Sequence, residues 1–529
     1  MTSGSNDPPS ASSRDTEVPS TGLRRVLGPV SATAIVVGSV IGSGIFFKAN
    51  LVASSIGRVD GIILVWIVCG ILSLLGALAT AELAAMMPNA GGQYVYLREA
   101  FGPGCAFLWG WAEFWMMRAG SVAALSVAFS TALSQSAALW FQQIGVLTTR
   151  QSGEDLYYLF PGGLELTQPT FLRVTAIASI LLLAVVNCTG TQRGGLLQNI
   201  TTFLKAGTLL SIIVLPFLTG QADLSLWKSE LSTARNVSWM AGIATAMTAV
   251  FWAYDGWGNI GPVAEEIRNP RRNIPIALTG GMLIVIVLYV GATLSYHLLM
   301  TTTEISQSRF VAASAFEKLF GSSGSAIASA AVMISTFGAL NANLLAGPRV
   351  IFAMSRDGVF LQSMSRIHPR YHTPHIAILS LAVWSVFLIA GSDLLRGITA
   401  PSWLGSFPAF IEEPIRRTVE SLSQKAIYDV LTDFVVFGAF VFYLLSVVAV
   451  FVLRSRKPEM VRPWRTPGYP ILPAVFVLGS GAFLLGMLLT SPVESLAGLG
   501  IMLAGGLLRF VGRRRCRGSA EATIGNPGH

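Results

Sequence analysis

The chain has 529 residues, of which 52% are hydrophobic and only 12% are Asp, Glu, Lys or Arg, and its mean hydropathy is +0.61. A soluble domain carries about 25% charged residues, so this composition excludes a large soluble protein, and the apolar content excludes a mostly disordered chain. The net charge of +9 does not indicate nucleic-acid binding here, because membrane proteins concentrate basic residues in their cytoplasmic loops. We therefore expect an all-α integral membrane protein.

The first segment, residues 1–26, is rich in Ser, Thr, Pro and Asp, and we expect a disordered cytoplasmic tail, because it lacks the apolar core of a signal peptide. Apolar segments long enough to cross about 30 Å of hydrocarbon follow it. These twelve predicted transmembrane helices are 29–51, 60–86, 104–134, 171–189, 197–219, 239–265, 274–300, 324–353, 375–391, 430–453, 470–489 and 492–510. A basic tail, 511–529, ends the chain.

The distribution of basic residues predicts the orientation in the membrane. Of the 36 Lys and Arg residues, 22 fall in the tails and in loops on the side of the termini, and 12 fall on the opposite side. Because Lys and Arg favour the cytoplasmic side, we expect both termini in the cytoplasm. The membrane we expect is the plasma membrane. The loops 135–170, 301–323 and 392–429 would then be external, the last as an insertion.

The first predicted span contains a stretch that does not favour a helix. Between Gly38 and Gly44 there are three glycines and two serines, which are poor helix formers. A broken helix in hydrocarbon leaves backbone groups without partners, so it occurs only inside protein or around a polar cavity. The alternative is a face of small residues that packs against another helix.

The sixth predicted span is interrupted by Asp255 and Gly256 within the stretch 251–259. An Asp in mid-membrane is costly and indicates a functional site, and Asp-Gly is typical of turns. Gly44 and Gly256 lie 212 positions apart, each in the first span of a five-span set. Two interrupted spans at matching places in two halves are typical of a secondary transporter built from inverted repeats.

The ends of the broken helices indicate the chemistry of the ligand. A helix that starts anew near Gly42–Gly44 offers free amides and a positive dipole end, which suit a carboxylate. A helix that ends near Trp252–Tyr254 offers free carbonyl groups, which suit an ammonium group. A site with both ends matches a zwitterion, and we therefore expect an α-amino acid as substrate.

Several motifs, in this order, resemble those of the amino acid–polyamine–organocation superfamily, and within it the L-type amino acid transporters. The resemblance extends from about Leu27 to about Arg509, and it implies a LeuT-like fold with broken helices 1 and 6. The two inverted repeats would be 27–219 and 220–454, followed by two further helices in 455–510. The matching stretches are Ile41-Gly42-Ser43-Gly44-Ile45-Phe46, Pro88-Asn89-Ala90-Gly91-Gly92-Gln93-Tyr94, Ala253-Tyr254-Asp255-Gly256-Trp257 with Ala264-Glu265-Glu266, Asn269-Pro270-Arg271-Arg272, and Ser355-Arg356-Asp357-Gly358.

The resemblance also implies roles for individual residues. Ser43 and Gly44 would bind the substrate carboxylate, carbonyl groups near Ile41, Trp252 and Asp255 would bind its amino group, and Trp252 would gate the site. Gly256 would give the substrate room. The predicted substrate-binding residues are Ile41, Gly42, Ser43, Gly44, Trp252, Ala253, Asp255 and Gly256.

Three polar features inside or beside the spans have two interpretations each. Lys205 either extends to the membrane interface or, as the resemblance implies, ties span five to the break in span one and replaces a sodium ion. Asp255 either selects cationic side chains, or it caps the broken helix or pairs with a basic side chain, which favours neutral substrates. Glu113 and Arg118 either pair with each other or serve the cavity. Glu265, Glu266, Arg271 and Arg272 are expected in an inner gate or loop network.

The function predicted from these features is that of a sodium-independent antiporter of neutral L-amino acids that works by alternating access. The alternatives are a proton-coupled symporter, an exchanger that accepts cationic amino acids through Asp255, and a sensor that does not transport. We expect no enzymatic activity, cofactor or metal, because no motif for these occurs in a fitting context. The expected partners are the amino acid and the lipid bilayer, without nucleic acid. A disulfide-linked heavy chain is not expected, since residues 135–170 contain no cysteine.

Overall fold

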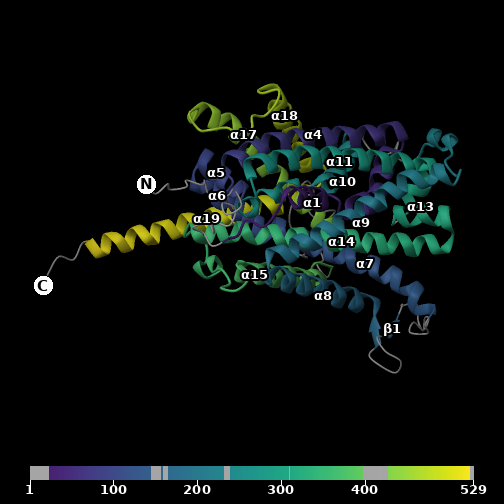
Figure 1. Ribbon diagram of the computed structural model, residues 1–529, viewed down its shortest axis with the longest axis horizontal. Coiled ribbons are helices and arrows are strands. Elements are labelled where there is room, and N and C mark those ends of the chain that lie inside the picture. The colour runs from purple at the N-terminus through teal and green to yellow at the C-terminus, as the bar shows by residue number, and fades with distance from the viewer. Residues whose placement is uncertain are drawn as a thin grey trace, which may run out of the picture.

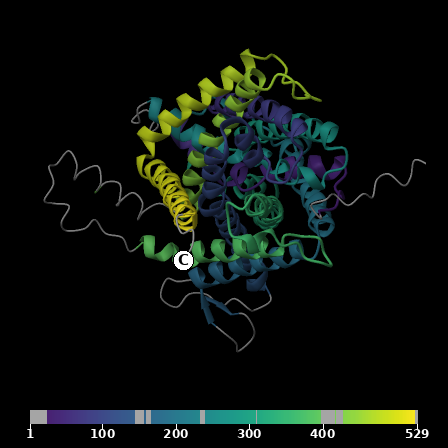
Figure 2. The same ribbon diagram turned by 90° about the vertical axis from the view of Figure 1, so that its left-hand side faces the viewer.

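The computed structural model describes residues 23–143, 156–158, 165–231, 239–308, 310–396, 416 and 427–524. Its long helices run side by side along the longest axis of the molecule (Figure 1), and Figure 2 looks along this bundle from one end. Ten helical stretches in these residues are long and apolar enough to cross a membrane. The chain is therefore a multi-pass membrane protein, as its composition predicts.

The helices vary widely in length, and several short ones connect the long ones. The first half contains α1 (Pro29–Val40), α2 (Gly44–Phe47), α3 (Ala49–Ile56), α4 (Val59–Met86), α5 (Gln93–Phe101), α6 (Pro103–Ala112), α7 (Ala119–Gln143), α8 (Gln168–Cys188) and α9 (Thr191–Leu218). The second half contains α10 (Trp239–Tyr254), α11 (Pro270–Leu299), α12 (Thr302–Gln307), α13 (Val311–Phe320), α14 (Ser322–Arg356), α15 (His375–Arg396), α17 (Ile427–Arg456), α18 (Ile471–Thr490) and α19 (Pro492–Ile524).

Ten of the twelve predicted spans correspond to the ten long apolar stretches. The predicted sixth span corresponds to α10, which has only 16 residues, and the ninth corresponds to the apolar part of α15, His375–Gly391. Beyond α10 the structure has two short 3₁₀ turns, Trp257–Ile260 and Ala264–Glu266, where we predicted a continuing helix. Gly258, Gly261 and Pro262 explain this difference, because glycine and proline disfavour an α-helix.

The all-α prediction omitted a short hairpin in the long loop 135–170. Strands β1 (Leu156–Tyr158) and β2 (Glu165–Thr167) pair in antiparallel fashion, with Leu156 opposite Thr167. Tyr and Thr favour strands, which accounts for the pairing. The rest of this loop at 144–155 and 159–164, the tail 1–22, most of the predicted insertion 392–429, and residues 525–529 lie outside the described residues.

The surface of the bundle is apolar, as contact with lipid requires. In α4, Trp66 and Cys69 are buried, whereas Leu64, Val68 and Ile71 on other sides of the helix are 40–60% exposed. A water-facing helix would carry polar side chains at those positions. Helices α8 and α15 lie side by side on one flank of the bundle, and α19 projects beyond the rest of the bundle at one end (Figure 1, Figure 2).

The interior is arranged around α1, which contacts α9, α11 and α14. Two further helix pairs surround it, because α11 packs along α4 and α14 packs along α7. The chain just before α1 is held in place as well. Leu23 is buried, and the backbone N–H groups of Val26 and Leu27 donate to the carbonyl oxygen of Glu266 at 3.0 Å. Residues 23–26, which we assigned to the N-terminal tail, thus pack against the bundle.

Both helix breaks expected from the sequence are present. Helix α1 ends at Val40, and Ile41 has a ψ of 88°, which is outside the helical range, before α2 begins at Gly44. Helix α10 ends at Tyr254, and Gly256 adopts the left-handed conformation with a φ of 110°. The prediction of interrupted first and sixth spans is confirmed.

Candidate functional site

The two helix breaks face each other at the centre of the bundle, and glycines permit this approach. A Cβ atom on Gly44 would lie 2.4 Å from the Cα atom of Ala253, and one on Gly256 would lie 2.9 Å from the carbonyl oxygen of Ser39. Either distance is too short for a real side chain, and the positive φ of Gly256 also favours glycine. The backbones of α1–α2 and α10 can therefore meet only because these two positions lack side chains.

A tyrosine on α11 joins the two breaks. The hydroxyl group of Tyr289 lies 2.8 Å from the carbonyl oxygen of Val40 and 3.1 Å from that of Ala253. Both carbonyl groups belong to the last turns of broken helices, where the usual intrahelical partner is missing. Sequence reasoning missed this residue, because α11 contains several other hydroxyl side chains and nothing in its sequence distinguishes Tyr289 from them.

Lys205 on α9 lies completely buried beside the break in α1. Its Nζ atom donates to the carbonyl oxygens of Gly38 and Ile41, both at 2.6 Å, and to that of Ser335 on α14 at 3.1 Å. The side chain does not extend to the membrane interface, so the alternative interpretation of Lys205 is wrong. One ammonium group thus links three spans at the point where the helix is open.

The Ile41 carbonyl group is already occupied in this arrangement. Besides Lys205, it has the Ser335 hydroxyl group at 3.3 Å, and that hydroxyl group also lies 3.0 Å from the carbonyl oxygen of Gly42. The sequence analysis expects carbonyl groups near Ile41 to bind the amino group of the substrate, and this stays a prediction. In this structure the Ile41 carbonyl itself is contacted by Lys205 and Ser335.

A narrow cavity of about 20 Å³ lies between the two breaks. It is lined by Ser39, Val40, Gly42, Ser43, Gly44, Ser121, Leu125, Trp252, Asp255, Gly256 and Asn343. Six of the eight predicted substrate-binding residues are therefore in its wall. The other two, Ile41 and Ala253, lie behind the wall, where their carbonyl groups contact Lys205 and Tyr289.

The cavity is covered on one side by an aromatic lid, which consists of Ser43, Trp252 and Tyr428. The Tyr428 hydroxyl group donates to Ser43 Oγ at 2.7 Å, and Trp252 Nε1 donates to the Tyr428 oxygen at 2.9 Å. Beyond this lid, the buried Lys48 ammonium group donates to Asp429 Oδ1 at 2.6 Å and to Thr432 Oγ1 at 2.8 Å. Tyr428 and Asp429 lie in the first turn of α17, at the end of the predicted insertion 392–429 and just before the tenth predicted span, and they could not be connected with Ser43 from the sequence.

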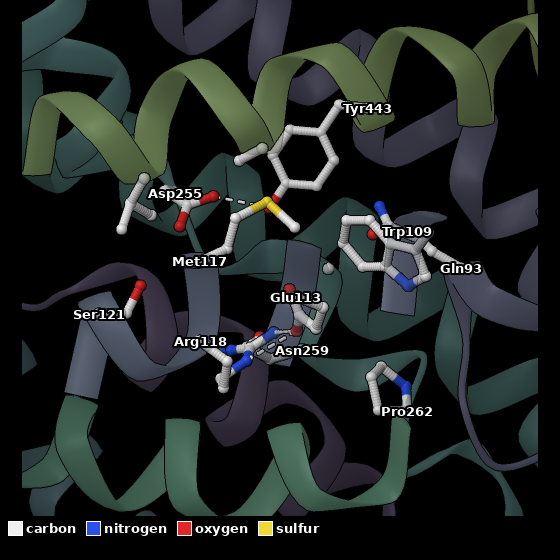
Figure 3. A pocket seen from close by; sticks show the side chains of 13 residues that line it. Gln93, Trp109, Glu113, Met117, Arg118, Ser121, Asp255, Asn259, Pro262 and Tyr443 are labelled. Carbon is white, nitrogen blue, oxygen red and sulfur yellow. Dashed lines mark hydrogen bonds and ion pairs between the residues drawn. The ribbon is translucent and has the colours of Figure 1, made fainter. Parts of the chain in front are cut away.

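A second cavity of about 20 Å³ adjoins the first, and the two share Ser121 and Asp255 (Figure 3). Asp255 Oδ1 accepts a hydrogen bond from the Tyr443 hydroxyl group at 2.6 Å. Gln93 Nε2 and Asn259 Nδ2 are buried in this region without a hydrogen-bond partner among the described residues. This space is therefore polar, and it offers unused donor groups.

Arg118 and Glu113 form an ion pair beside the second cavity (Figure 3). The segment Glu113–Arg118 is a π-helical turn, which places residues five apart on the same side, and this explains why the predicted pair can form. Arg118 Nη1 also donates to the side-chain oxygens of Asn259 and Asn343, both at 2.6 Å. The guanidinium group thus connects the third, sixth and eighth predicted spans.

The other end of the site is closed by a terminal-side cluster, which we define as Glu265, Glu266, Arg349 and Arg356. The buried Arg349 Nε donates to Glu266 Oε1 at 2.9 Å, and the Glu265 carboxylate accepts from the Ala90 backbone N–H at 3.0 Å and lies 3.6 Å from Arg356 Nη1. The expectation of a network around Glu265 and Glu266 is confirmed, but its basic partners are Arg349 and Arg356, whereas the expected Arg271 and Arg272 are exposed and form no ion pair with a described residue.

Next to this cluster, Asp357 accepts hydrogen bonds from Arg98 and from the Tyr94 hydroxyl group, the latter at 2.9 Å. Burial and the hydrogen bond to Asp357 raise the pKa of Tyr94, so its phenol remains a donor at neutral pH. Asp357 thereby fixes α5 to the end of α14, which extends the closure on this side.

Comparisons with known proteins agree with this geometry. The sequence profile of the family described as amino acid permease matches residues 27–504. The serine/threonine exchanger SteT of Bacillus subtilis is 30% identical over 505 residues, which cover 94% of this chain and 99% of that protein. The b(0,+)-type amino acid transporter 1 of Mus musculus is 27% identical over 481 residues, 91% of this chain and 86% of that protein. The cystine/glutamate transporter of Homo sapiens is 28% identical over 458 residues, 86% of this chain and 78% of that protein. The chain belongs to the amino acid permease family.

Proposed function

We propose that the protein is a sodium-independent exchanger of neutral L-amino acids that works by alternating access. The observation that carries this proposal is the meeting of two broken helices around one small cavity. Among the described residues, the N–H groups of Ser43 and Gly44 have no acceptor, and they would bind the substrate carboxylate. Carbonyl groups near Trp252 and Asp255 would bind its ammonium group.

Lys205 supports the sodium-independent part of the proposal. Its Nζ atom lies among the carbonyl oxygens of Gly38, Ile41 and Ser335, a set of ligands that would also suit a hard cation. A tethered ammonium group at this position excludes a second cation by charge repulsion and by occupancy. The role of sodium would thus be taken over by a covalently attached charge.

The proposal includes a LeuT-like topology of twelve spans, with inverted repeats at 27–219 and 220–454 and two further helices in 455–510. The break in α1 is the counterpart of the break after α10 in this arrangement. We place the protein in the plasma membrane with both termini in the cytoplasm, because basic residues favour that side. The aromatic lid then faces outward and the terminal-side cluster faces inward.

The relatives support transport by exchange. Two of them are named for what they carry, a serine/threonine exchanger and a cystine/glutamate transporter, and another relative is named a large neutral amino acids transporter small subunit. Residues 135–170 contain no cysteine, and we retain the prediction that no heavy chain is attached there by a disulfide.

Counterflow in liposomes tests the proposal. We expect purified protein to take up a labelled neutral amino acid only when unlabelled amino acid is inside, at the same rate with sodium or with choline outside. Uptake into empty vesicles that follows a pH gradient would instead establish the proton symporter. Binding of amino acids without uptake in either format would establish a sensor.

Asp255 provides a test of substrate charge. Its carboxylate accepts from Tyr443, and Arg118 approaches the same cavity, so we expect little free negative charge for a cationic side chain. Asp255→Asn should therefore change the uptake of neutral amino acids less than about threefold, and the parent should not be inhibited by excess arginine or lysine. Competition by arginine in the parent that is lost in Asp255→Asn would favour the exchanger of cationic amino acids. Tyr443→Phe serves as the matched control, because it removes the hydrogen bond but keeps the charge.

A further inference from the structure

A third cavity, separate from the substrate site, lies at the end of the bundle where α1 begins. Its volume is about 210 Å³, and it is bounded by three chain segments. We call it the basic pocket, and its wall consists of Arg24, Val26, Thr189, Gly190, Thr191, Gln192, Arg193, Glu266, Arg370, Tyr371 and His372. The proposed transport cycle assigns no role to this space.

The charge of the basic pocket is not neutralised by the protein. Arg24, Arg193 and Arg370 are exposed, and no carboxylate of the described residues forms an ion pair with any of them. The acidic residue in the wall, Glu266, is already bound to Arg349 at 2.9 Å and to the Thr191 hydroxyl group at 2.6 Å. Three guanidinium groups therefore line one cavity, and none of them has a carboxylate partner among the described residues.

The three segments are fixed by contacts that do not involve the arginines. The Thr373 hydroxyl group donates to the carbonyl oxygen of Cys188 at 2.8 Å, which holds the loop of Arg370 against the end of α8. The Val26 N–H group donates to the backbone carbonyl oxygen of Glu266, and this contact holds the segment that carries Arg24. A ligand would therefore meet an arrangement that is already formed, with little cost in ordering the chain.

The start of α9 adds to the attraction for an anion. This helix has 28 residues and begins at Thr191, directly after Gly190 with its φ of 140°. The first residues of this helix, Thr191 to Arg193, line the basic pocket, so the positive end of the helix dipole lies at its wall. Planar guanidinium groups match the oxygen atoms of a phosphate group in two-point contacts.

The neighbouring surface indicates where the anion comes from. Val185, Leu196 and Ile200, close to the turn between α8 and α9, are 57%, 61% and 50% exposed. Apolar side chains at this exposure face acyl chains in a membrane protein. Basic pockets that adjoin such a surface bind the headgroups of anionic lipids. We propose that the basic pocket binds the phosphate-bearing headgroup of an anionic phospholipid, whose acyl chains lie along α8 and α9.

The experiment is a titration of the purified full-length protein in detergent, with native mass spectrometry and the thermal midpoint as readouts. The probes are phosphatidylglycerol, phosphatidylcholine and inorganic phosphate. The test variant combines Arg24→Gln, Arg193→Gln and Arg370→Gln. The matched control combines Arg271→Gln, Arg272→Gln and Arg366→Gln, which removes the same charge from exposed positions outside the pocket.

We expect the parent and the control to bind phosphatidylglycerol equally, and the test variant to bind it roughly 100-fold more weakly. Equal loss in both triple variants, or no loss in the test variant, would overturn the site. Inorganic phosphate that stabilises the parent and displaces the lipid would reassign the pocket to a soluble phosphate. Arg370→Gln alone, with an expected loss of roughly fivefold, replaces the triple variant if that variant elutes as aggregate. The measurement requires no transported amino acid, so its outcome does not depend on the proposed function.

Discussion

Lys205→Met should abolish exchange. The substitution keeps the length of the side chain but removes the ammonium group that holds the carbonyl oxygens of Gly38 and Ile41 at 2.6 Å. A buried carbonyl group left without a donor costs about 1–3 kcal/mol, and two such groups would change the conformation of the break. Since the break forms one wall of the proposed binding site, we expect the rate of counterflow to fall by at least roughly 100-fold.

The matched control for this variant is Lys228→Met, which alters an exposed lysine outside the bundle. It should exchange at the rate of the parent. The thermal midpoint of Lys205→Met should also fall, and added sodium should raise it if the vacated oxygen cage accepts a cation. Parent-like exchange by Lys205→Met would show that the ammonium group is dispensable, and it would remove the basis for sodium independence.

Gly44→Ala should eliminate binding of every amino acid substrate. The added Cβ atom would lie 2.4 Å from Cα and 3.0 Å from N of Ala253, which are backbone atoms that cannot move aside without shifting α10. Overpacking of this kind costs about 1–3 kcal/mol, and here it separates the two broken ends that must contact one zwitterion. The measurement is the rise in thermal midpoint that a neutral amino acid causes in the parent, which should vanish in the variant.

Gly207→Ala is a suitable control for Gly44→Ala. Gly207 lies on the exposed face of α9, and its added Cβ atom would meet no atom within 4 Å. This variant should retain the full ligand-induced rise, because α9 gains only a better helix former. A full rise in Gly44→Ala as well would mean that the substrate does not require the close contact of the two breaks.

The helix breaks could be predicted from the sequence because their signals are local. Gly and Ser between positions 38 and 44, and the Asp255–Gly256 pair, contrast with the apolar residues around them. Lys205 was visible for the same reason, as a lone cation in a span. Glu113 and Arg118 could be paired from their spacing, although the π-helical turn that makes the pairing possible gave no signal of its own.

The remaining contacts of the site could not be predicted, because they depend on which spans become neighbours. Tyr289 and Ser335 look like ordinary polar residues in packed membrane helices. Tyr428 lies 385 positions from Ser43, and only the folded arrangement places the two hydroxyl groups 2.7 Å apart. The 3₁₀ turns after α10 were not predicted, because the apolar residues around them favour a continuous span. Gly258, Gly261 and Pro262 disfavour an α-helix there and were the available signal.

The aromatic lid and the terminal-side cluster, which close the site at opposite ends, differ in the charges that must separate when each one opens. The aromatic lid has one ion pair beyond it, between the buried Lys48 ammonium group and Asp429, whose side chain is 39% exposed and therefore stays partly hydrated. The terminal-side cluster contains the fully buried pair of Arg349 and Glu266, and breaking such a pair is costly unless both charges are rehydrated. Under the proposed alternating access, we therefore expect the terminal-side cluster to open more slowly than the aromatic lid, so that release past the cluster is the slow half of the turnover.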